Sequence, residues 1–242
     1  MGDRRWRTGM WGLLVAVMCV SFAGCTGGGH SAAAQGSAAA SASAAAKASR
    51  LSSEEKLRAA LLTRVNGVAP AGPASMGDYG TLASVYAGSQ GAAGSQVTPK
   101  ACAVAARNGF EPAALQGAEA AAVTFKVAKN LVSEVLISSS GSSAKAAISG
   151  LVPARCTHYV AKSGGKSVTY SVSQVAVTGI GRQAEALDVR PSGDGAQEEM
   201  WSLIYRGAGF VGTVTVVGPN ASEKAVQELG QQAYTFAAKT LS

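Results

Sequence analysis

The segment from Lys166 to Gly181, KSVTYSVSQVAVTGIG, alternates apolar and polar side chains with a period of two. Val168, Tyr170 and Val172 fall on one side of such a segment, and serine and threonine fall on the other. Successive side chains of a β-strand point to opposite faces, so this pattern predicts a half-buried strand. The chain must therefore build a sheet with an apolar layer packed against one face.

Further segments have the composition and spacing of strands. A hairpin is predicted around Gly207-Ala208-Gly209, because its glycines can take the positive φ angles that tight turns require. Residues 121–127 and 132–138 are joined through Lys129-Asn130, and another strand covers residues 184–189. These segments predict an antiparallel sheet.

Two amphipathic helices are predicted before and between the strands. The first begins at Leu51, where Ser52 and Glu55 have capping-box spacing, and it ends at Asn66-Gly67. The second lies in SSGSSAKAAISG and is broken by Pro153. The side chains expected to face inward are Leu57, Ala60, Leu61 and Val65 in the first helix and Ala147, Ile148 and Leu151 in the second.

A third helix is predicted near the C-terminus. Asn220 and Glu223 again have capping-box spacing, and an apolar stripe follows, formed by Val226, Leu229, Ala233 and Phe236. We expect this stripe to pack across the sheet, because an exposed stripe would be unfavourable in water. Helices and antiparallel strands in this order predict an α+β domain.

One part of the predicted domain is irregular in composition. Residues 68–102 are rich in glycine, proline and serine, which predicts a surface excursion leading to Cys102. Helix propensity returns over residues 101–108.

The N-terminal region has the pattern of a lipoprotein signal peptide. Arg4, Arg5 and Arg7 precede an apolar run over residues 12–22, and Ala23-Gly24-Cys25 follows at once. The Cys25 thiol would take a diacylglyceryl thioether before cleavage on its N-terminal side. The apolar run is shorter than the roughly 20 residues that a transmembrane helix needs. Simple secretion and an uncleaved anchor are the alternative interpretations.

The residues after Cys25 predict a tether. Residues 26–49 are almost entirely glycine, alanine and serine, too poor in large apolar side chains to offset the entropy of ordering. We therefore divide the chain into a signal peptide (1–24), a disordered tether (25–50) and a domain (51–242). The lipid on Cys25 would hold the domain at the cell membrane, on its extracytoplasmic face.

Cysteine usage agrees with export. Cys19 lies in the signal peptide and Cys25 is the lipidation site, so the exported domain keeps Cys102 and Cys156. A lone pair in an oxidising compartment most simply forms one disulfide. A metal site would need further ligands beside His158, the domain's single histidine, and a Cys–His nucleophile pair is the remaining interpretation.

The order of these features resembles a known family. The segments LRAALLTRV, KACAV, ARC and LIYRGAGFVGTVTVV, followed by an amphipathic helix, are similar to the PknH-like extracellular domain of actinobacterial lipoproteins and of a receptor serine/threonine kinase. The resemblance covers residues 51–241. It implies an antiparallel sheet backed by helices around a cleft, with a role in ligand binding or sensing. Family members often carry two disulfides, whereas this domain has cysteines for one.

The charge pattern argues against nucleic-acid binding. The formal net charge is +7, but lysine and arginine are scattered and not interleaved with aromatic residues. Such an excess would instead favour an anionic envelope surface.

No catalytic motif is found in the sequence. Gly-x-Ser-x-Gly, a phosphate-binding loop and paired helical histidines are absent. A serine hydrolase would have to use His158. The sequence does not indicate which of Asp78, Asp188 and Asp194 would orient that histidine in a Ser-His-Asp triad. We therefore expect no enzymatic activity, no cofactor and no metal.

Two aromatic residues are the candidates for a ligand site. Trp201 and Tyr205 share a strand face and would line an apolar pocket or, alternatively, pack in the core. The leading hypothesis is a membrane-anchored binding or sensor-like lipoprotein for a small or lipidic ligand. The other two are an interaction module that docks an envelope protein and a hydrolase that uses His158.

Overall fold

The computed structural model describes most of the predicted domain, namely residues 53–82, 95–103, 106, 113–149, 151–193 and 198–242. The predicted signal peptide, the predicted tether, Cys25, Ser52 and Asp194 lie outside these residues. Within the described part of the chain, no helix combines the length and apolar character that crossing a membrane requires.

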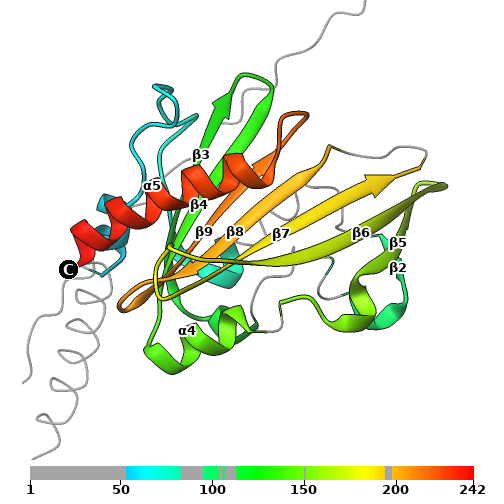
Figure 1. Ribbon diagram of the computed structural model, residues 1–242, viewed down its shortest axis with the longest axis horizontal. Coiled ribbons are helices and arrows are strands. Elements are labelled where there is room, and N and C mark those ends of the chain that lie inside the picture. The colour runs from blue at the N-terminus through cyan, green and yellow to red at the C-terminus, as the bar shows by residue number, and fades with distance from the viewer. Residues whose placement is uncertain (1–52, 83–94, 104–105, 107–112, 150, 194–197) are drawn as a thin grey trace, which may run out of the picture. The chain divides into compact units, whose positions relative to one another are not determined.

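The described residues form one antiparallel sheet of nine strands (Figure 1). Its order is β1-β3-β4-β9-β8-β7-β6-β5-β2. The strands are β1 (Ser75–Asp78), β2 (Gln96–Thr98), β3 (Glu119–Val127), β4 (Asn130–Ser138), β5 (His158–Ser163), β6 (Lys166–Val177), β7 (Gln183–Ser192), β8 (Met200–Arg206) and β9 (Phe210–Val217).

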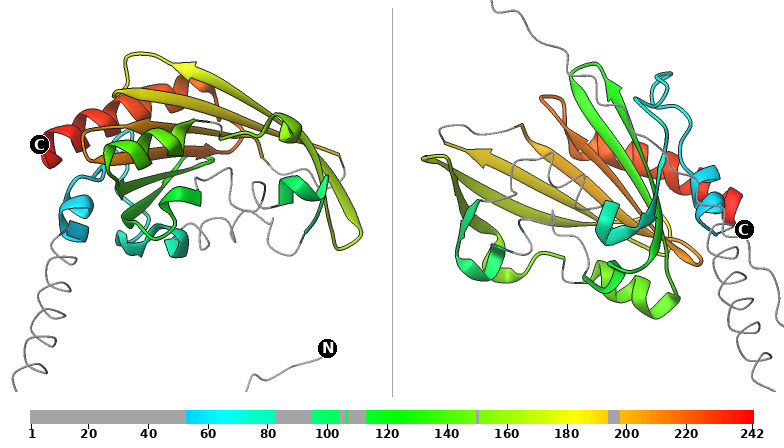
Figure 2. Two further views of the ribbon diagram at one scale, coloured as in Figure 1. Left: turned by 90° about the horizontal axis from the view of Figure 1, so that it is seen from below. Right: turned by 180° about the vertical axis from the view of Figure 1, so that it is seen from behind.

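Helices lie against both faces of this sheet. The helix α5 is in front of the strands in Figure 1 and behind them in the right-hand view of Figure 2. The helical segments are residues 53–59, residues 79–82, η1 (Lys100–Cys102), η2 (Ala113–Leu115), α4 (Gly141–Ile148), η3 (Ala154–Cys156) and α5 (Glu223–Leu241). The predicted fold class, an α+β domain with an antiparallel sheet backed by helices, is confirmed.

The strands divide the core into two apolar clusters, because alternate side chains of each strand point to opposite faces. We call the first the α5-side cluster; it includes Leu57, Leu61, Val123, Phe125, Val132, Leu136, Trp201, Leu203, Tyr205, Phe210, Val214, Val226, Leu229 and Ala233. The second, the α4-side cluster, includes Ala120, Ile137, Ala147, Ile148, Leu187, Ile204, Val211 and the two disulfide cysteines.

The C-terminal helix differs in detail from the prediction. Its N-cap is Ser222, whose Oγ accepts a hydrogen bond from the Ala225 N–H at 3.2 Å, so the predicted cap at Asn220 is wrong. Val226, Leu229 and Ala233 are buried as predicted, but Phe236 is 37% exposed. Ala237 is buried instead, since the stripe advances by four residues after Ala233.

The first helix is shorter than predicted. Leu57, Ala60 and Leu61 are buried, but the helix ends at residue 59. Val65 and Val68 then form an isolated β-bridge around Asn66-Gly67, both of which have positive φ angles. This two-residue turn reverses the chain, as the Asn-Gly pair favours.

The region predicted to be irregular contains two strands. β1 and β2 lie at the two edges of the sheet and are the shortest of the described strands. β1 shows no apolar–polar alternation, and the alternation in β2 extends over only three residues, so register against a neighbour, rather than local pattern, defines these strands.

Candidate functional site

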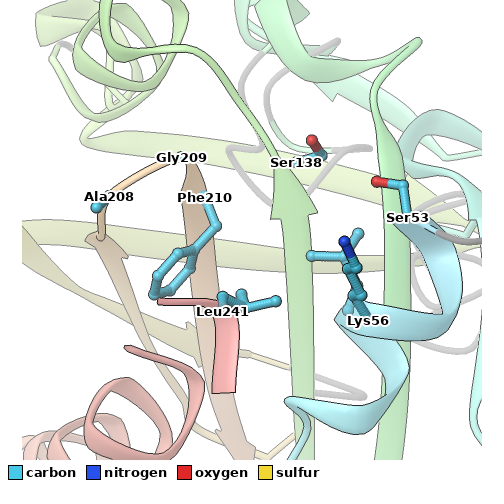
Figure 3. A pocket seen from close by; sticks show the side chains of 8 residues that line it. Ser53, Lys56, Ser138, Ala208, Gly209, Phe210 and Leu241 are labelled. Carbon is cyan, nitrogen blue, oxygen red and sulfur yellow. The ribbon is translucent and has the colours of Figure 1, made fainter. Parts of the chain in front are cut away.

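A groove lies where the N-terminal helix, the C-terminal end of α5 and the β8–β9 turn meet (Figure 3). Its volume is about 190 Å³. Eight residues line it: Ser53, Lys56, Leu57, Ser138, Ala208, Gly209, Phe210 and Leu241. The groove thus has apolar walls with an ammonium group and two hydroxyl groups beside them.

Phe210 forms the buried wall of this groove. Its ring packs edge-on against Tyr205 with centroids 6.3 Å apart, and it stacks on Tyr234 with centroids 6.5 Å apart. A side chain at Gly207 would overlap the Phe210 ring. Glycine at position 207 is therefore needed for the aromatic wall, in addition to any freedom it gives the turn.

A buried carboxyl group lies on the same face of β4 as Ser138. Glu134 is 0% exposed, between Val132 and Leu136 of the α5-side cluster. Its Oε2 accepts a hydrogen bond from the Leu62 N–H at 2.7 Å, and its Oε1 has no hydrogen-bond partner. Burial raises the pKa of Glu134 from its ordinary 4.5 to about 8, although the Leu62 N–H acts in the opposite direction.

Tyr205 brings a second buried polar atom to this region. It is 0% exposed, and its Oη has no hydrogen-bond partner. Burial raises the pKa of Tyr205 well above its ordinary value, and the charge of Glu134 raises it further. The phenol and the carboxyl group therefore interact electrostatically inside the α5-side cluster.

The two aromatic candidates share a face, as predicted, and both belong to the α5-side cluster. Trp201 is 6% exposed, and its Nε1–H donates to Glu199 Oε1 at 3.0 Å. Neither Trp201 nor Tyr205 is among the residues that line the groove. Tyr205 contributes to it only through Phe210, on which its ring packs.

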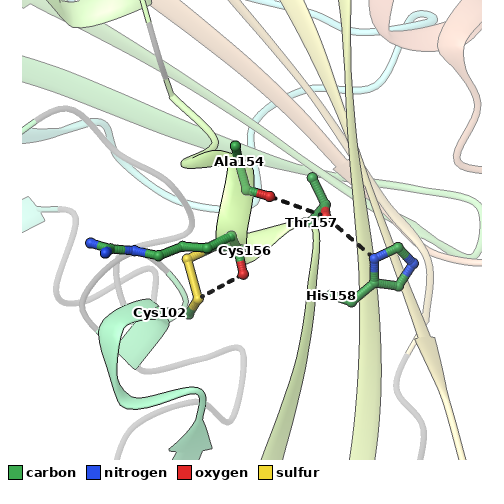
Figure 4. The surroundings of a disulfide bond; sticks show 6 residues. Cys102, Ala154, Cys156, Thr157 and His158 are labelled. Carbon is green, nitrogen blue, oxygen red and sulfur yellow. Dashed lines mark hydrogen bonds between the residues drawn. A yellow bond between two sulfur atoms is a disulfide. The ribbon is translucent and has the colours of Figure 1, made fainter.

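The predicted cysteine pair is joined in the structure (Figure 4). Cys102 and Cys156 form a disulfide with Cα atoms 5.5 Å apart, and both are fully buried. The bond joins η1 to η3, two single-turn helices, and both cysteines belong to the α4-side cluster.

His158 lies outside the groove. It is exposed at the start of β5, and its ring points away from the disulfide (Figure 4). Its Nδ1 lies 3.3 Å from Thr157 Oγ1. Cys156 belongs to η3 and His158 to β5, and the Cys156 thiol is bound in the disulfide, so the alternative interpretation of a Cys–His nucleophile pair is wrong.

A second polar cluster surrounds Arg190. Its Nε lies 2.8 Å from Asp188 Oδ2 and 3.3 Å from Glu199 Oε1. Burial raises the pKa of Asp188, and Arg190 opposes that shift. Within the described residues, no group of three or more histidine, cysteine, aspartate or glutamate side chains could hold a metal ion.

Glu134 is not among the site residues predicted from the sequence, although a signal for it is present there. In the predicted strand VSEVLIS, residues 132–138, Val132, Glu134 and Leu136 share one face. A charged residue at the centre of an apolar face is uncommon, because burying it without a partner is costly. A glutamate on the apolar face of a strand therefore identifies Glu134 as a candidate functional residue.

No family model matches the chain, and no curated protein matches it. The extracellular domain of PknH from Mycobacterium tuberculosis is a structural neighbour, with a TM-score of 0.49 and 13% identity over 78% of this chain and 96% of that one. An uncharacterised protein from Mycobacterium smegmatis has a TM-score of 0.36 and 14% identity over 61% of this chain and 75% of that one. Structural similarity at these identities and TM-scores does not indicate a function, so the family resemblance remains a prediction.

Proposed function

We propose that this chain is a lipoprotein that displays a non-catalytic binding domain on the extracytoplasmic face of the membrane. The observation that carries the binding role is the groove between the N-terminal helix, the β8–β9 turn and α5. Ligand sites are typically concave and mostly apolar, with a few polar groups that orient the ligand. The groove has this composition.

The anchoring role is supported by the N-terminal sequence. A basic region, an apolar run and Ala23-Gly24-Cys25 precede the domain. The Cys102–Cys156 disulfide in the domain fits an oxidising compartment outside the cytoplasm. The chemistry of the domain is therefore consistent with export.

The lining residues indicate the class of ligand. Leu57, Phe210 and Leu241 offer apolar contact, while the Lys56 ammonium would attract an anionic group and the two serine hydroxyls could bind it. A volume of about 190 Å³ is below the usual range for drug-sized ligands, so a small ligand or one end of a larger amphiphile would fit. We propose a small or lipidic molecule with an anionic head group.

Anchoring is tested by Cys25→Ser, because oxygen cannot form the thioether. We expect this variant to lose globomycin-sensitive processing and to leave the detergent phase. If it still matures at the same position and partitions with the membrane, the lipoprotein assignment is wrong.

Binding is tested by native mass spectrometry of the protein purified from membranes. We expect a retained small molecule in the wild type and its loss in Lys56→Glu. Lys166→Glu is the matched control, because Lys166 is an exposed lysine in the β5–β6 hairpin, outside the groove. Equal retention in the two variants would remove the groove from the proposal.

The same experiment addresses the two other hypotheses. A retained protein chain, confirmed by crosslinking, would favour an interaction module. A hydrolase would require turnover that His158→Ala abolishes, although His158 contacts Thr157 and lies outside the groove.

A further inference from the structure

The segment from residue 53 to residue 62 is held to the sheet by two kinds of contact. Leu57, Ala60 and Leu61 bury apolar side chains in the α5-side cluster. Just after the helix, the Leu62 N–H donates to Glu134 Oε2 at 2.7 Å. This hydrogen bond links the segment to the centre of β4, 72 positions further along the chain.

The same segment forms one wall of the groove. Ser53, Lys56 and Leu57 belong to it, and the opposite wall comes from the β8–β9 turn and Leu241 (Figure 3). The segment is also the first described part of the domain, next to the predicted tether. It precedes the local Val65–Val68 bridge and pairs with no strand of the sheet, so it could detach without breaking the sheet, and its detachment would open the groove.

The surroundings of Glu134 favour the neutral acid. Its direct neighbours across β3 and β9 are Val123 and Val214. Tyr205 is the titratable group that faces it from β8, and Tyr234 of α5 lies beyond, against the Tyr205 ring. The N-terminal segment offers Glu134 the Leu62 N–H, while Lys56 and Arg58 are exposed. No charged side chain of the described residues contributes to the environment of this carboxyl group.

We propose that Glu134 acts as a pH-dependent latch for the N-terminal helix. By latch we mean that the neutral side chain keeps residues 53–62 docked on the sheet at acid pH and that the ionised side chain favours their release. As a neutral acid it is compatible with the apolar cluster and keeps the segment docked. When it ionises, an unpaired charge is enclosed, and the least costly way to hydrate it is to release the segment that covers it. That such release opens a ligand groove rests on the function proposed above.

The expected pH range follows from the two states of the latch. With the segment docked the Glu134 pKa is about 8, and with the segment released the carboxyl group is hydrated and returns toward 4.5. The released state therefore binds fewer protons between these values. Its population relative to the docked state should rise up to about tenfold per pH unit from pH 4.5 to 8 and then level off.

Hydrogen–deuterium exchange of the full mature protein, without added ligand, measures this population. We expect the opening equilibrium of residues 53–65, corrected for the intrinsic exchange rate, to rise between pH 5 and 8 in the wild type. The amides of α5, which covers the same cluster, should stay protected. In Glu134→Gln the protection of residues 53–65 should not change with pH, because the amide does not ionise.

Two results would overturn the latch. One is the same pH dependence in the wild type and Glu134→Gln, and the other is loss of protection in residues 53–65 and α5 together, which would mean global unfolding. If Glu134→Gln does not fold, Glu134→Leu supplies a second neutral variant, and the contrast between residues 53–65 and α5 in the wild type decides alone. Because no ligand is used, this result is independent of the Lys56→Glu test. A negative result in that test would disprove ligand binding in the groove and would leave the pH-dependent release of residues 53–62 unaffected.

Discussion

Tyr205 lies opposite Gly212 in the register of β8 and β9, and its ring covers the place where a side chain at position 212 would stand. A Cβ at this position would overlap the ring and the hydroxyl oxygen. The absence of a side chain on β9 therefore lets the phenol lie flat across the strand, toward β4 and Glu134.

Gly212→Ala should destabilise the domain. The added methyl group must displace Tyr205, and overpacking of this kind typically costs about 1–3 kcal/mol. Chemical denaturation measures the free energy of unfolding. Gly72→Ala is the matched control, because nothing lies within 4 Å of a Cβ at that position. Equal stability of the two variants would show that Tyr205 does not lie over Gly212.

Tyr205 should tolerate loss of its hydroxyl but not of its ring. Tyr205→Phe removes a buried Oη that has no partner, so we expect unchanged or increased stability. Tyr205→Ala should lower the free energy of unfolding by about 3–5 kcal/mol, as for other buried aromatic residues. If Tyr205→Ala instead weakened ligand binding with little loss of stability, Tyr205 would be a pocket wall, the first of the two interpretations drawn from the sequence.

Stability should decrease with rising pH because of Glu134. Its pKa is raised in the folded state, so the folded protein binds more protons than the unfolded chain between pH 4.5 and 8. The contribution is fully present below pH 4.5, falls by up to about 1.4 kcal/mol per pH unit, and is gone above pH 8. Denaturant unfolding at several pH values should show this fall in the wild type and in Glu228→Gln, an exposed control. A similar fall in Glu134→Gln would assign the effect to other groups.

Loss of the disulfide should destabilise the domain. The cysteines are 54 positions apart, and the chain-entropy estimate for closing such a loop is about 4 kcal/mol. Denaturation of the Cys102→Ala/Cys156→Ala double variant, compared with the oxidised wild type, measures the loss. Thiol titration of the unfolded, unreduced wild type should find neither cysteine free, and two free thiols would contradict the bond.

Substitutions at the start of α5 should distinguish the two candidate caps. Ser222→Ala removes the side chain that accepts from the Ala225 N–H, and loss of an N-cap typically costs about 1 kcal/mol. Asn220→Ala leaves this hydrogen bond in place and should cost less. Thermal unfolding of both variants measures the difference, and the reverse order would restore the cap at Asn220.

Much of the secondary structure follows from local pattern. The alternation around Val168 and Val172 predicts β6, and the glycines between Arg206 and Phe210 predict the β8–β9 hairpin. These predictions succeed because a strand with one buried face has apolar residues at every second position, and this spacing is visible in the sequence. The two cysteines of the exported domain are likewise enough to indicate one disulfide once export is inferred.

The α+β class, most of the strands and the burial of residues such as Leu57 and Val226 can therefore be predicted from local patterns. The strand order, the edge positions of β1 and β2, and the meeting of Ser53, Phe210 and Leu241 in one groove cannot, because they depend on contacts between segments far apart in the chain. Periodicity is a property of neighbouring residues, whereas the hydrogen bond from Leu62 to Glu134 depends on the packing of segments 72 positions apart.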